Sequence, residues 1–168
     1  MKKVILCLIV ISLFTFGMGR KPAKIETENV KDSSSEEKAP DFSLKDLSDK
    51  QVQLKDFQGK KVVLLVFWAT WCHYCVQEIP ELKNLYNEFK DKDFEILAIN
   101  IQESKEKVKS FVNKNEIKYT VLLDDGTIAK KYNIYGIPTN IIIDKKGNIK
   151  SLGMLPQDPK SFIENLLH

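Results

Sequence analysis

The chain has 168 residues, 43% of them hydrophobic, and a formal net charge of +3. That length fits one domain plus additional sequence, and the apolar content is sufficient to bury a core. Two of the 26 basic residues, Lys2 and Lys3, belong to the N-terminal segment, which leaves 24 basic against 23 acidic residues, so the charge gives no reason to propose a nucleic-acid partner.

Residues 1–19 have the pattern of an export signal. Two lysines precede an apolar run at residues 4–18, and Gly17 and Gly19 have the small side chains and the spacing that a signal peptidase prefers. The run is shorter than the roughly 20 residues that span a bilayer comfortably, which favours a cleaved signal peptide and leaves a retained membrane anchor as the alternative. We therefore expect an extracytoplasmic protein, in the periplasm or on the outer face of the cytoplasmic membrane.

A polar linker is expected at residues 20–38. This stretch is charged, rich in serine and almost free of large apolar residues, so it cannot bury enough surface to order itself. One folded domain should then occupy residues 39–168, with no internal repeat.

Apolar runs and capping residues predict strands and helices in this domain. An unbroken apolar run at residues 62–69 indicates a central strand that is covered on both faces. The expected strands are residues 42–44, 51–54, 62–69, 94–101, 119–123, 140–143 and 149–152, and the expected helices are residues 72–90, 104–114, 127–132 and 158–167, with caps at Ser104 and Asp158. Early strands alternate with helices and a hairpin comes late, an order that predicts an α/β sandwich with a mixed sheet.

The stretch Trp71-Cys72-His73-Tyr74-Cys75 stands between the buried strand and the next helix. The first sulfur should therefore lie at a helix N-terminus, where free N–H groups and the helix dipole favour an anion. Cys72 should ionise more easily than a free thiol, and Cys75, one turn further in, should ionise less easily. A dithiol catalyst needs this asymmetry, because one thiolate attacks and the second thiol resolves the mixed disulfide.

Three other interpretations of the cysteine pair fit the sequence less well. A zinc ribbon needs about four ligands, and the chain offers no second cysteine pair, only His73 and His168. A purely structural disulfide would close a two-residue loop, which constrains the unfolded chain little. A peroxidase pattern, P-x-x-x-T-x-x-C, would need Pro and Thr where this chain has Leu65 and Ala69.

Three segments, APDFSLKDL, VVLLVFWATWCHYCVQEIP and YGIPTNIIID, resemble the bacterial TlpA/ResA branch of the thioredoxin superfamily, and the likeness covers residues 39–168. The resemblance implies an α/β thioredoxin fold, a mixed central sheet flanked by helices, with an N-terminal β-hairpin and a helix-strand insertion. It also implies membrane-linked or periplasmic thiol-disulfide exchange, often in cytochrome c maturation. Reduction of the oxidised cysteine pair after each cycle would need a membrane electron donor of the CcdA/DsbD type. Folding would need no cofactor.

The resemblance also assigns roles to individual residues. Cys72 resembles the nucleophile and Cys75 the resolving cysteine. Pro138 resembles the proline whose preceding peptide bond is cis and which lies against the cysteines. A cis bond would turn the backbone of Ile137 outward, so that its N–H and C=O can pair with an extended substrate segment, with Trp71 as an exposed edge of the same binding platform.

Glu78 is the third candidate catalytic residue. At 3.6 residues per turn it falls angularly between Leu85 and Phe89 on the apolar side of its helix, one turn beyond Cys75. A glutamate there should be partly buried, and burial raises a carboxyl pKa toward the range that suits proton exchange with a thiol. The alternative is an ordinary surface glutamate. The resemblance supports the functional interpretation, because WCxxCxxExP recurs in the family, whereas ordinary thioredoxins carry their buried acid on the preceding strand, where this chain has Val66.

The dipeptide His73-Tyr74 departs from the Glu-Pro common in this branch. A protonated His73 beside the thiolate would stabilise the reduced form and make the couple more oxidising, or else it is an exposed imidazole of little influence. We expect a monomeric thiol-disulfide oxidoreductase that reduces disulfides in exported proteins. The alternatives are an oxidase or isomerase, a copper carrier that uses the two sulfurs and His73, and an adaptor that only docks.

Overall fold

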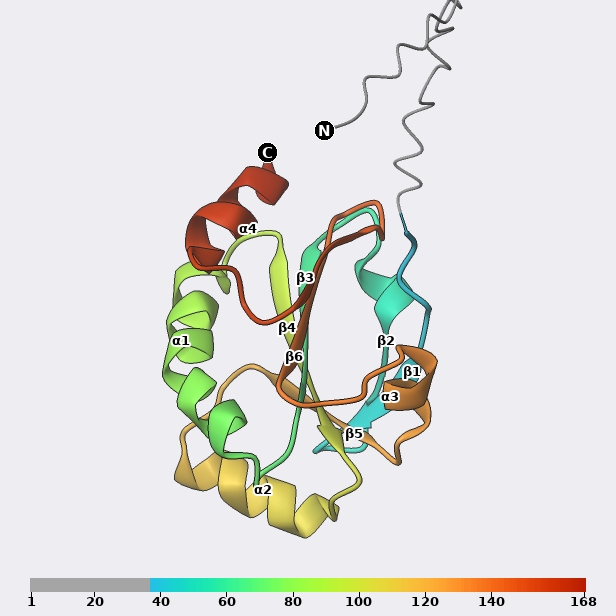
Figure 1. Ribbon diagram of the computed structural model, residues 1–168, viewed down its shortest axis with the longest axis vertical. Helices are drawn as coiled ribbons and strands as arrows, with labels where there is room; N and C mark the ends of the chain where they lie inside the picture. Colours follow the sequence, from blue (N-terminus) through green and yellow to red (C-terminus); the bar gives the residue numbers. More distant parts are fainter. Residues whose placement is uncertain (1–36) are drawn as a thin grey trace, which may run out of the picture. The chain divides into compact units, whose positions relative to one another are not determined.

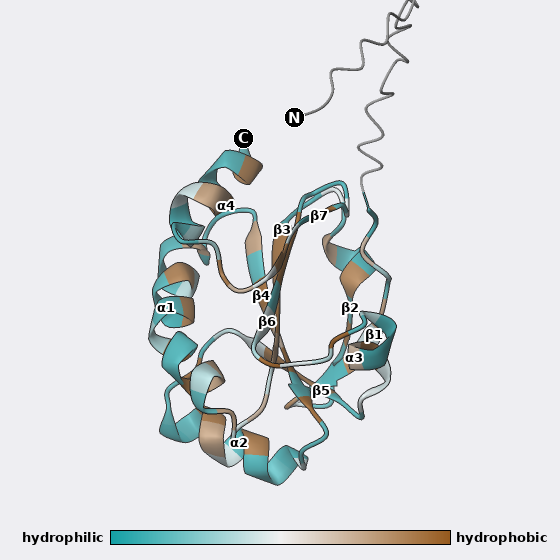
Figure 2. Cartoon of the chain, viewed as in Figure 1, coloured by the Kyte–Doolittle hydropathy of each residue, from teal (hydrophilic) through white to brown (hydrophobic). Residues whose placement is uncertain are grey.

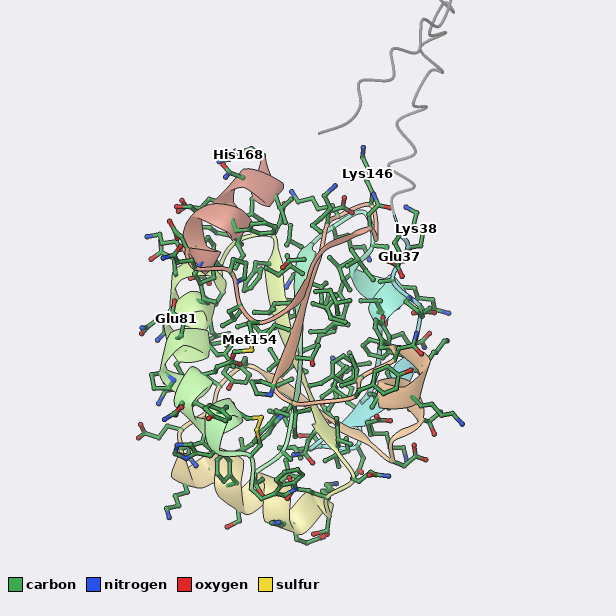
Figure 3. All side chains as sticks on the ribbon, in the orientation of Figure 1. Glu37, Lys38, Glu81, Lys146, Met154 and His168 are labelled. Carbon is green, nitrogen blue, oxygen red and sulfur yellow. A yellow bond between two sulfur atoms is a disulfide. The ribbon has the colours of Figure 1, made fainter. Side chains whose placement is uncertain are left out.

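The computed structural model describes residues 37–168. The expected export signal at residues 1–19, and residues 20–36 of the expected linker, lie outside this part of the chain. Glu37 and Lys38, which the sequence assigned to the end of the linker, already pair with the domain: Ile149 N–H donates to the Glu37 carbonyl oxygen at 2.8 Å, and Lys38 Nζ donates to the Lys146 carbonyl oxygen at 2.8 Å (Figure 3). Within residues 37–168 no helix combines the length and hydropathy needed to cross a bilayer.

Seven strands form one mixed sheet in the order β2-β1-β5-β4-β3-β6-β7 (Figure 1). The strands are β1 (Ser43–Asp46), β2 (Gln51–Gln53), β3 (Val62–Trp68), β4 (Phe94–Ile101), β5 (Thr120–Asp124), β6 (Thr139–Ile143) and β7 (Ile149–Gly153). The central strands β3, β4 and β5 run parallel, and β6, β7, β1 and β2 join antiparallel on either side. The mixed sheet expected from the sequence is confirmed.

Helices cover both faces of the sheet. They are α1 (His73–Phe89), α2 (Lys105–Lys114), α3 (Thr127–Lys131) and α4 (Pro159–Leu167), with a 3-10 turn η1 at Leu54–Phe57. Buried residues of α1, α2 and α4 pack into one core, and those of α3, η1 and the β1–β2 hairpin pack into the other. Figure 1 shows α1 and α4 on one side of the sheet and α3 with the hairpin on the other.

The central strand β3 supplies side chains to both cores. Its residues alternate along the strand, because successive side chains of a strand point to opposite faces. Leu64 and Val66 join the core beneath α1, while Leu65 and Phe67 join the core beneath α3. In Figure 2 apolar residues gather on the central strands, whereas α1 and α2 mix teal and brown as amphipathic helices do. Burial on both faces explains why this run shows no alternation of polarity.

The predicted elements are present with small shifts at their ends. Ser104 and Asp158 cap α2 and α4 by accepting from the N–H groups of Lys107 and Ser161. The second hairpin strand is shorter than expected, because Leu54 turns into η1 and buries its side chain in the core instead of extending β2. Cys72 caps α1 rather than lying within it.

Candidate active site

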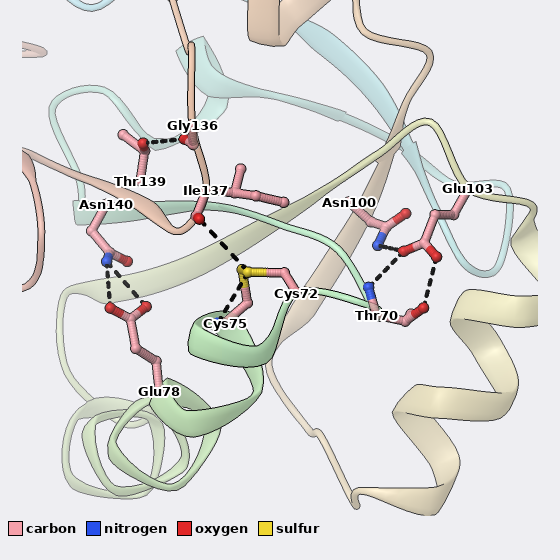
Figure 4. The surroundings of a disulfide bond; sticks show 10 residues. All are labelled: Thr70, Cys72, Cys75, Glu78, Asn100, Glu103, Gly136, Ile137, Thr139 and Asn140. Atoms are coloured by element: carbon pink, nitrogen blue, oxygen red, sulfur yellow. Dashed lines mark hydrogen bonds between the residues drawn. A yellow bond between two sulfur atoms is a disulfide. The ribbon is translucent and has the colours of Figure 1, made fainter.

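A disulfide joins Cys72 and Cys75 at the junction between β3 and α1 (Figure 4). Cys72 is the N-cap residue of α1, and its sulfur accepts a hydrogen bond from the Cys75 N–H at 3.2 Å. Both residues are buried, with Cys72 6% exposed and Cys75 3% exposed. The structure thus places the pair at the strand-to-helix junction that the sequence indicated.

This position favours a negative charge on the first sulfur. The N–H groups of the first helical turn lack partners inside the helix, and the helix dipole adds a partial positive charge at the same end. In the disulfide the Cys75 N–H already points at the Cys72 sulfur. After reduction the same N–H would stabilise a Cys72 thiolate, which is the nucleophilic form of the side chain.

The loop before β6 lies against the disulfide. The Ile137–Pro138 peptide bond is cis, as predicted, and the Ile137 carbonyl oxygen lies 3.7 Å from the Cys72 sulfur (Figure 4). The hydroxyl of Thr139 closes the loop by donating to the Gly136 carbonyl oxygen at 2.7 Å. Backbone polar groups are therefore presented directly beside the candidate nucleophile.

An open groove continues from this loop along the surface. It is lined by Trp71, Ile101, Gln102, Ile134, Tyr135, Gly136 and Ile137. Of these lining residues, the aromatic Trp71 and Tyr135 are exposed. Tyr74, on the first turn of α1, is exposed as well but does not line the groove. The sequence predicted the exposed edge at Trp71 but did not single out Tyr135.

Glu78 lies on the inner side of α1 and is half-buried. Asn140 of β6 donates from Nδ2 to both carboxylate oxygens, at 3.2 Å each (Figure 4). Burial raises the pKa of Glu78, and the Asn140 hydrogen bond offsets part of that rise. The half-burial and the direction of the pKa shift agree with the expectation from helical spacing.

A second carboxylate, Glu103, binds the segment that precedes Cys72. It accepts from the Thr70 N–H at 2.6 Å, from the Thr70 hydroxyl at 2.7 Å and from Asn100 Nδ2 at 2.9 Å, and Lys107 Nζ lies 2.7 Å away (Figure 4). Burial alone would raise its pKa, but the hydrogen bonds from Lys107, Thr70 and Asn100 outweigh burial and lower the pKa to about 2. Glu103 thus stays ionised and fixes the segment that leads into Cys72.

Sequence reasoning missed Glu103, although one signal pointed to it. The residue follows β4, and Thr70 follows β3, which runs parallel beside it. Carboxyl ends of neighbouring parallel strands meet at one edge of a sheet, so polar residues placed there come together. A search of strand ends, rather than of cysteine neighbours, would have found this network.

His73 and Tyr74 are both exposed on the first turn of α1. His73 Nε2 lies 3.1 Å from Gln77 Nε2, and the His73 and Tyr74 rings meet edge to face at 5.7 Å between centroids. The imidazole is thus engaged along the helix surface. Within residues 37–168 no group of three His, Cys, Asp or Glu side chains is arranged to hold a metal ion.

Comparison with known proteins gives a consistent set of relatives. The AhpC/TSA family model matches residues 36–152. The thiol-disulfide oxidoreductase ResA of Bacillus thuringiensis is 42% identical over 112 residues, which cover 66% of this chain and 64% of the relative, so the match spans less than two thirds of that protein. ResA of Geobacillus kaustophilus is 35% identical over 132 residues, covering 76% of this chain and 75% of the relative.

A solved structure shows the same fold. The thioredoxin domain of a thiol-disulfide oxidoreductase from Bacteroides vulgatus superposes with a TM-score of 0.72 at 30% identity, covering 79% of this chain and 97% of that domain. The thioredoxin fold that the sequence motifs implied is confirmed. The β1–β2 hairpin and the α2–β5 pair are the expected N-terminal hairpin and helix-strand insertion.

Proposed function

Because the chain belongs to the AhpC/TSA family and to the TlpA/ResA-like group of thioredoxin-fold proteins, we propose that it is an exported thiol-disulfide oxidoreductase that reduces disulfides in extracytoplasmic proteins. The observation that carries the proposal is the position of Cys72. Its sulfur caps α1, accepts from the Cys75 N–H at 3.2 Å and lies 3.7 Å from the Ile137 carbonyl oxygen. A thiolate formed there is stabilised by the helix and lies beside backbone groups that can align a substrate.

The reaction is a two-step exchange. The Cys72 thiolate attacks one sulfur of the substrate disulfide, which breaks that bond and leaves a mixed disulfide and a substrate thiolate. The Cys75 thiol then gives its proton to Glu78 and attacks the Cys72 sulfur, which releases the second substrate thiolate and forms the Cys72–Cys75 disulfide. Two electrons pass to the substrate, and the proton held on Glu78 can return to a leaving thiolate.

A polypeptide fits this site as substrate. The groove beside Cys72 is open and bordered by exposed aromatic rings of Trp71 and Tyr135. The backbone N–H and C=O of Ile137 can pair with an extended chain laid in the groove, as in strand addition. These features support a disulfide-containing exported protein as the partner, and the resemblance of the sequence motifs to the TlpA/ResA branch makes cytochrome c maturation the narrower form of the proposal.

After each reaction the Cys72–Cys75 disulfide must be reduced again, which requires an electron donor outside the cytoplasm. The predicted export signal at residues 1–19 supports an extracytoplasmic location, where no soluble thiol pool can be assumed. The proposed donor is a membrane protein of the CcdA/DsbD type. Measuring the reduction potential decides the direction of electron flow: a value near the thioredoxin value of about −270 mV supports a reductase, and one near about −120 mV an oxidase.

A peroxidase is the less favoured enzyme. Its motif would need Pro and Thr at positions that are Leu65 and Ala69 here, and both side chains are fully buried in the core. Because both residues are apolar, neither position supplies a polar side chain to the cysteines.

Trapping tests the proposal directly. In a Cys75→Ala variant the resolving thiol is absent, so we expect a covalent adduct between Cys72 and a protein partner to accumulate in cells and to disappear on reduction. The matched control is the Cys72→Ala, Cys75→Ala double variant, which should form none. If the single variant forms no adduct, or the double variant forms as much, Cys72 is not the nucleophile.

A further inference from the structure

Asn140 is an unusual residue for its place in the sheet. It stands in β6 before three isoleucines, opposite Val66 of β3 and Gly153 of β7, and it is only 1% exposed. Asparagine is disfavoured in strands, and a buried polar side chain is costly unless it is hydrogen-bonded. Such a conflict between local preference and position usually marks a specific interaction.

Asn140 interacts with Glu78, and it does so through only one of the two polar atoms of its carboxamide. Nδ2 donates to both carboxylate oxygens at 3.2 Å, whereas Oδ1 is buried and has no partner within the described part of the chain (Figure 4). Buried polar atoms in native proteins are nearly always paired, so an unpaired one needs a reason. An amide carries both donors and acceptors, and the state shown uses the donors alone.

The Asn140 hydrogen bonds, rather than an ion pair, hold the Glu78 carboxylate. Tyr119, ahead of β5, lies within reach of the charge of Glu78, whereas Cys72 and Cys75 at the start of α1 are joined in a disulfide and do not titrate in this state. Burial raises the pKa of Tyr119, and the charge of Glu78 raises it further, so the phenol stays neutral. Among residues 37–168 no lysine or arginine forms an ion pair with Glu78.

We propose that Asn140 is a positioning residue that holds the Glu78 carboxyl group in both of its protonation states. When Glu78 is ionised, Nδ2 donates to the two oxygens. When Glu78 carries a proton, the carboxamide turns over by half a rotation, so that Oδ1 takes the place of Nδ2 and accepts from the carboxylic O–H. Oδ1, which has no partner while Glu78 is ionised, is thus the acceptor for the protonated Glu78. The carboxyl group stays in one place while its charge changes.

The consequence for catalysis rests on the proposed function, in which Glu78 takes a proton from Cys75. A carboxyl group that kept its place only when charged would move away after accepting the proton. An ambivalent partner removes that movement and also stabilises the ionised form, which limits how far burial raises the pKa of Glu78. Asn140 therefore tunes the pH at which proton exchange can occur.

The test follows the Glu78 carboxyl carbon by NMR as a function of pH in the oxidised, 13C-labelled protein, where no thiol reacts. In Asn140→Leu the donor is lost while the branched outline of the side chain is kept, and we expect the titration midpoint of Glu78 to rise by about one pH unit. In Asn140→Asp, a change of nearly the same shape, two carboxyls share the site. One of them should keep its proton to a clearly higher pH than Glu78 does in the unchanged protein.

Two controls make the result specific. Glu78→Gln identifies the resonance, and Asn100→Leu removes another buried asparagine, one that donates to Glu103 instead. The second control should leave the Glu78 midpoint where it was. An unchanged midpoint in both Asn140 variants overturns the proposal, and if Asn140→Leu fails to fold the aspartate variant decides alone. Because the oxidised protein is studied, a failure to trap a partner with Cys75→Ala would leave this result untouched.

Discussion

Glu78 and Glu103 lie on either side of the same disulfide and are held in opposite ways (Figure 4). Glu78 receives hydrogen bonds from one neutral amide, and burial raises its pKa. Glu103 receives hydrogen bonds from Thr70 and Asn100 and an ion pair from Lys107, and its pKa falls to about 2 although burial works against this.

The difference shows that burial alone does not set the charge of a carboxyl group. Removing a carboxylate from water favours the neutral form, and each donor aimed at it restores the ionised form. Glu103 has enough donors to remain a fixed anion, which suits a structural support. Glu78 has few, which suits a group that takes up and gives back a proton.

The largest effect that would test this contrast is on catalysis. Glu78→Gln removes the proton acceptor, and we expect the rate of the resolving step at pH 7 to fall about a hundredfold, since general acid–base groups contribute at least that much. The measurement is the single-turnover release of reduced substrate from the Cys72 mixed disulfide. Glu81→Gln is the matched control, because Glu81 lies exposed on the same helix and its loss changes the net charge equally (Figure 3).

The same variant should be more stable, not less. The pKa of Glu78 is raised in the folded protein, so its charged form costs stability, and that cost appears as the pH rises from its ordinary value through the raised one. Glu78→Gln should therefore raise the free energy of unfolding at pH 7 while it slows the reaction. A variant that is both slow and destabilised would show that Glu78 is structural.

Glu103→Gln should instead lower the free energy of unfolding, by roughly 2 kcal/mol at pH 7. Its new amide N–H2 group faces donors, which then lack an acceptor. The pKa of Glu103 is lowered, so its contribution is complete above its ordinary pKa and is lost as the pH falls toward about 2. Denaturant unfolding at several pH values checks both points. The gap to the unchanged protein should narrow in acid, whereas Glu106→Gln, at an exposed position of α2, should show almost no gap.

Most of the fold follows from features that are local in sequence. The unbroken apolar run predicted β3, and capping side chains placed the starts of α2 and α4. The hairpin was less well placed, because the turn of Leu54 into η1 depends on packing against the core rather than on a sequence signal. Local patterns therefore located the elements, and tertiary contacts adjusted their ends.

The active site also combines local contacts, which the sequence predicted, with contacts between distant residues, which it did not. Cys75 and Glu78 lie in the first two turns of α1 and Cys72 caps it, so the position of a helix start and helical spacing predicted their arrangement. The partners of the two glutamates come from elsewhere: Thr70 and Glu103 are 33 residues apart, and Glu78 and Asn140 are 62 apart. Their contacts depend on which strands are neighbours and in which register, and the sequence alone did not give either.

Lys107→Met gives the smallest expected effect and separates the contributions to Glu103. The Lys107 side chain is 56% exposed, whereas the Glu103 side chain is 4% exposed, so water and salt screen the amine more than the Thr70 and Asn100 donors. We expect a loss of stability below about 1 kcal/mol that shrinks further in high salt, measured by denaturant unfolding at low and high ionic strength. A loss as large as that of Glu103→Gln would mean that the ion pair, rather than the buried neutral donors, keeps this carboxylate charged, and the contrast with Glu78 would then be one of ion pairing.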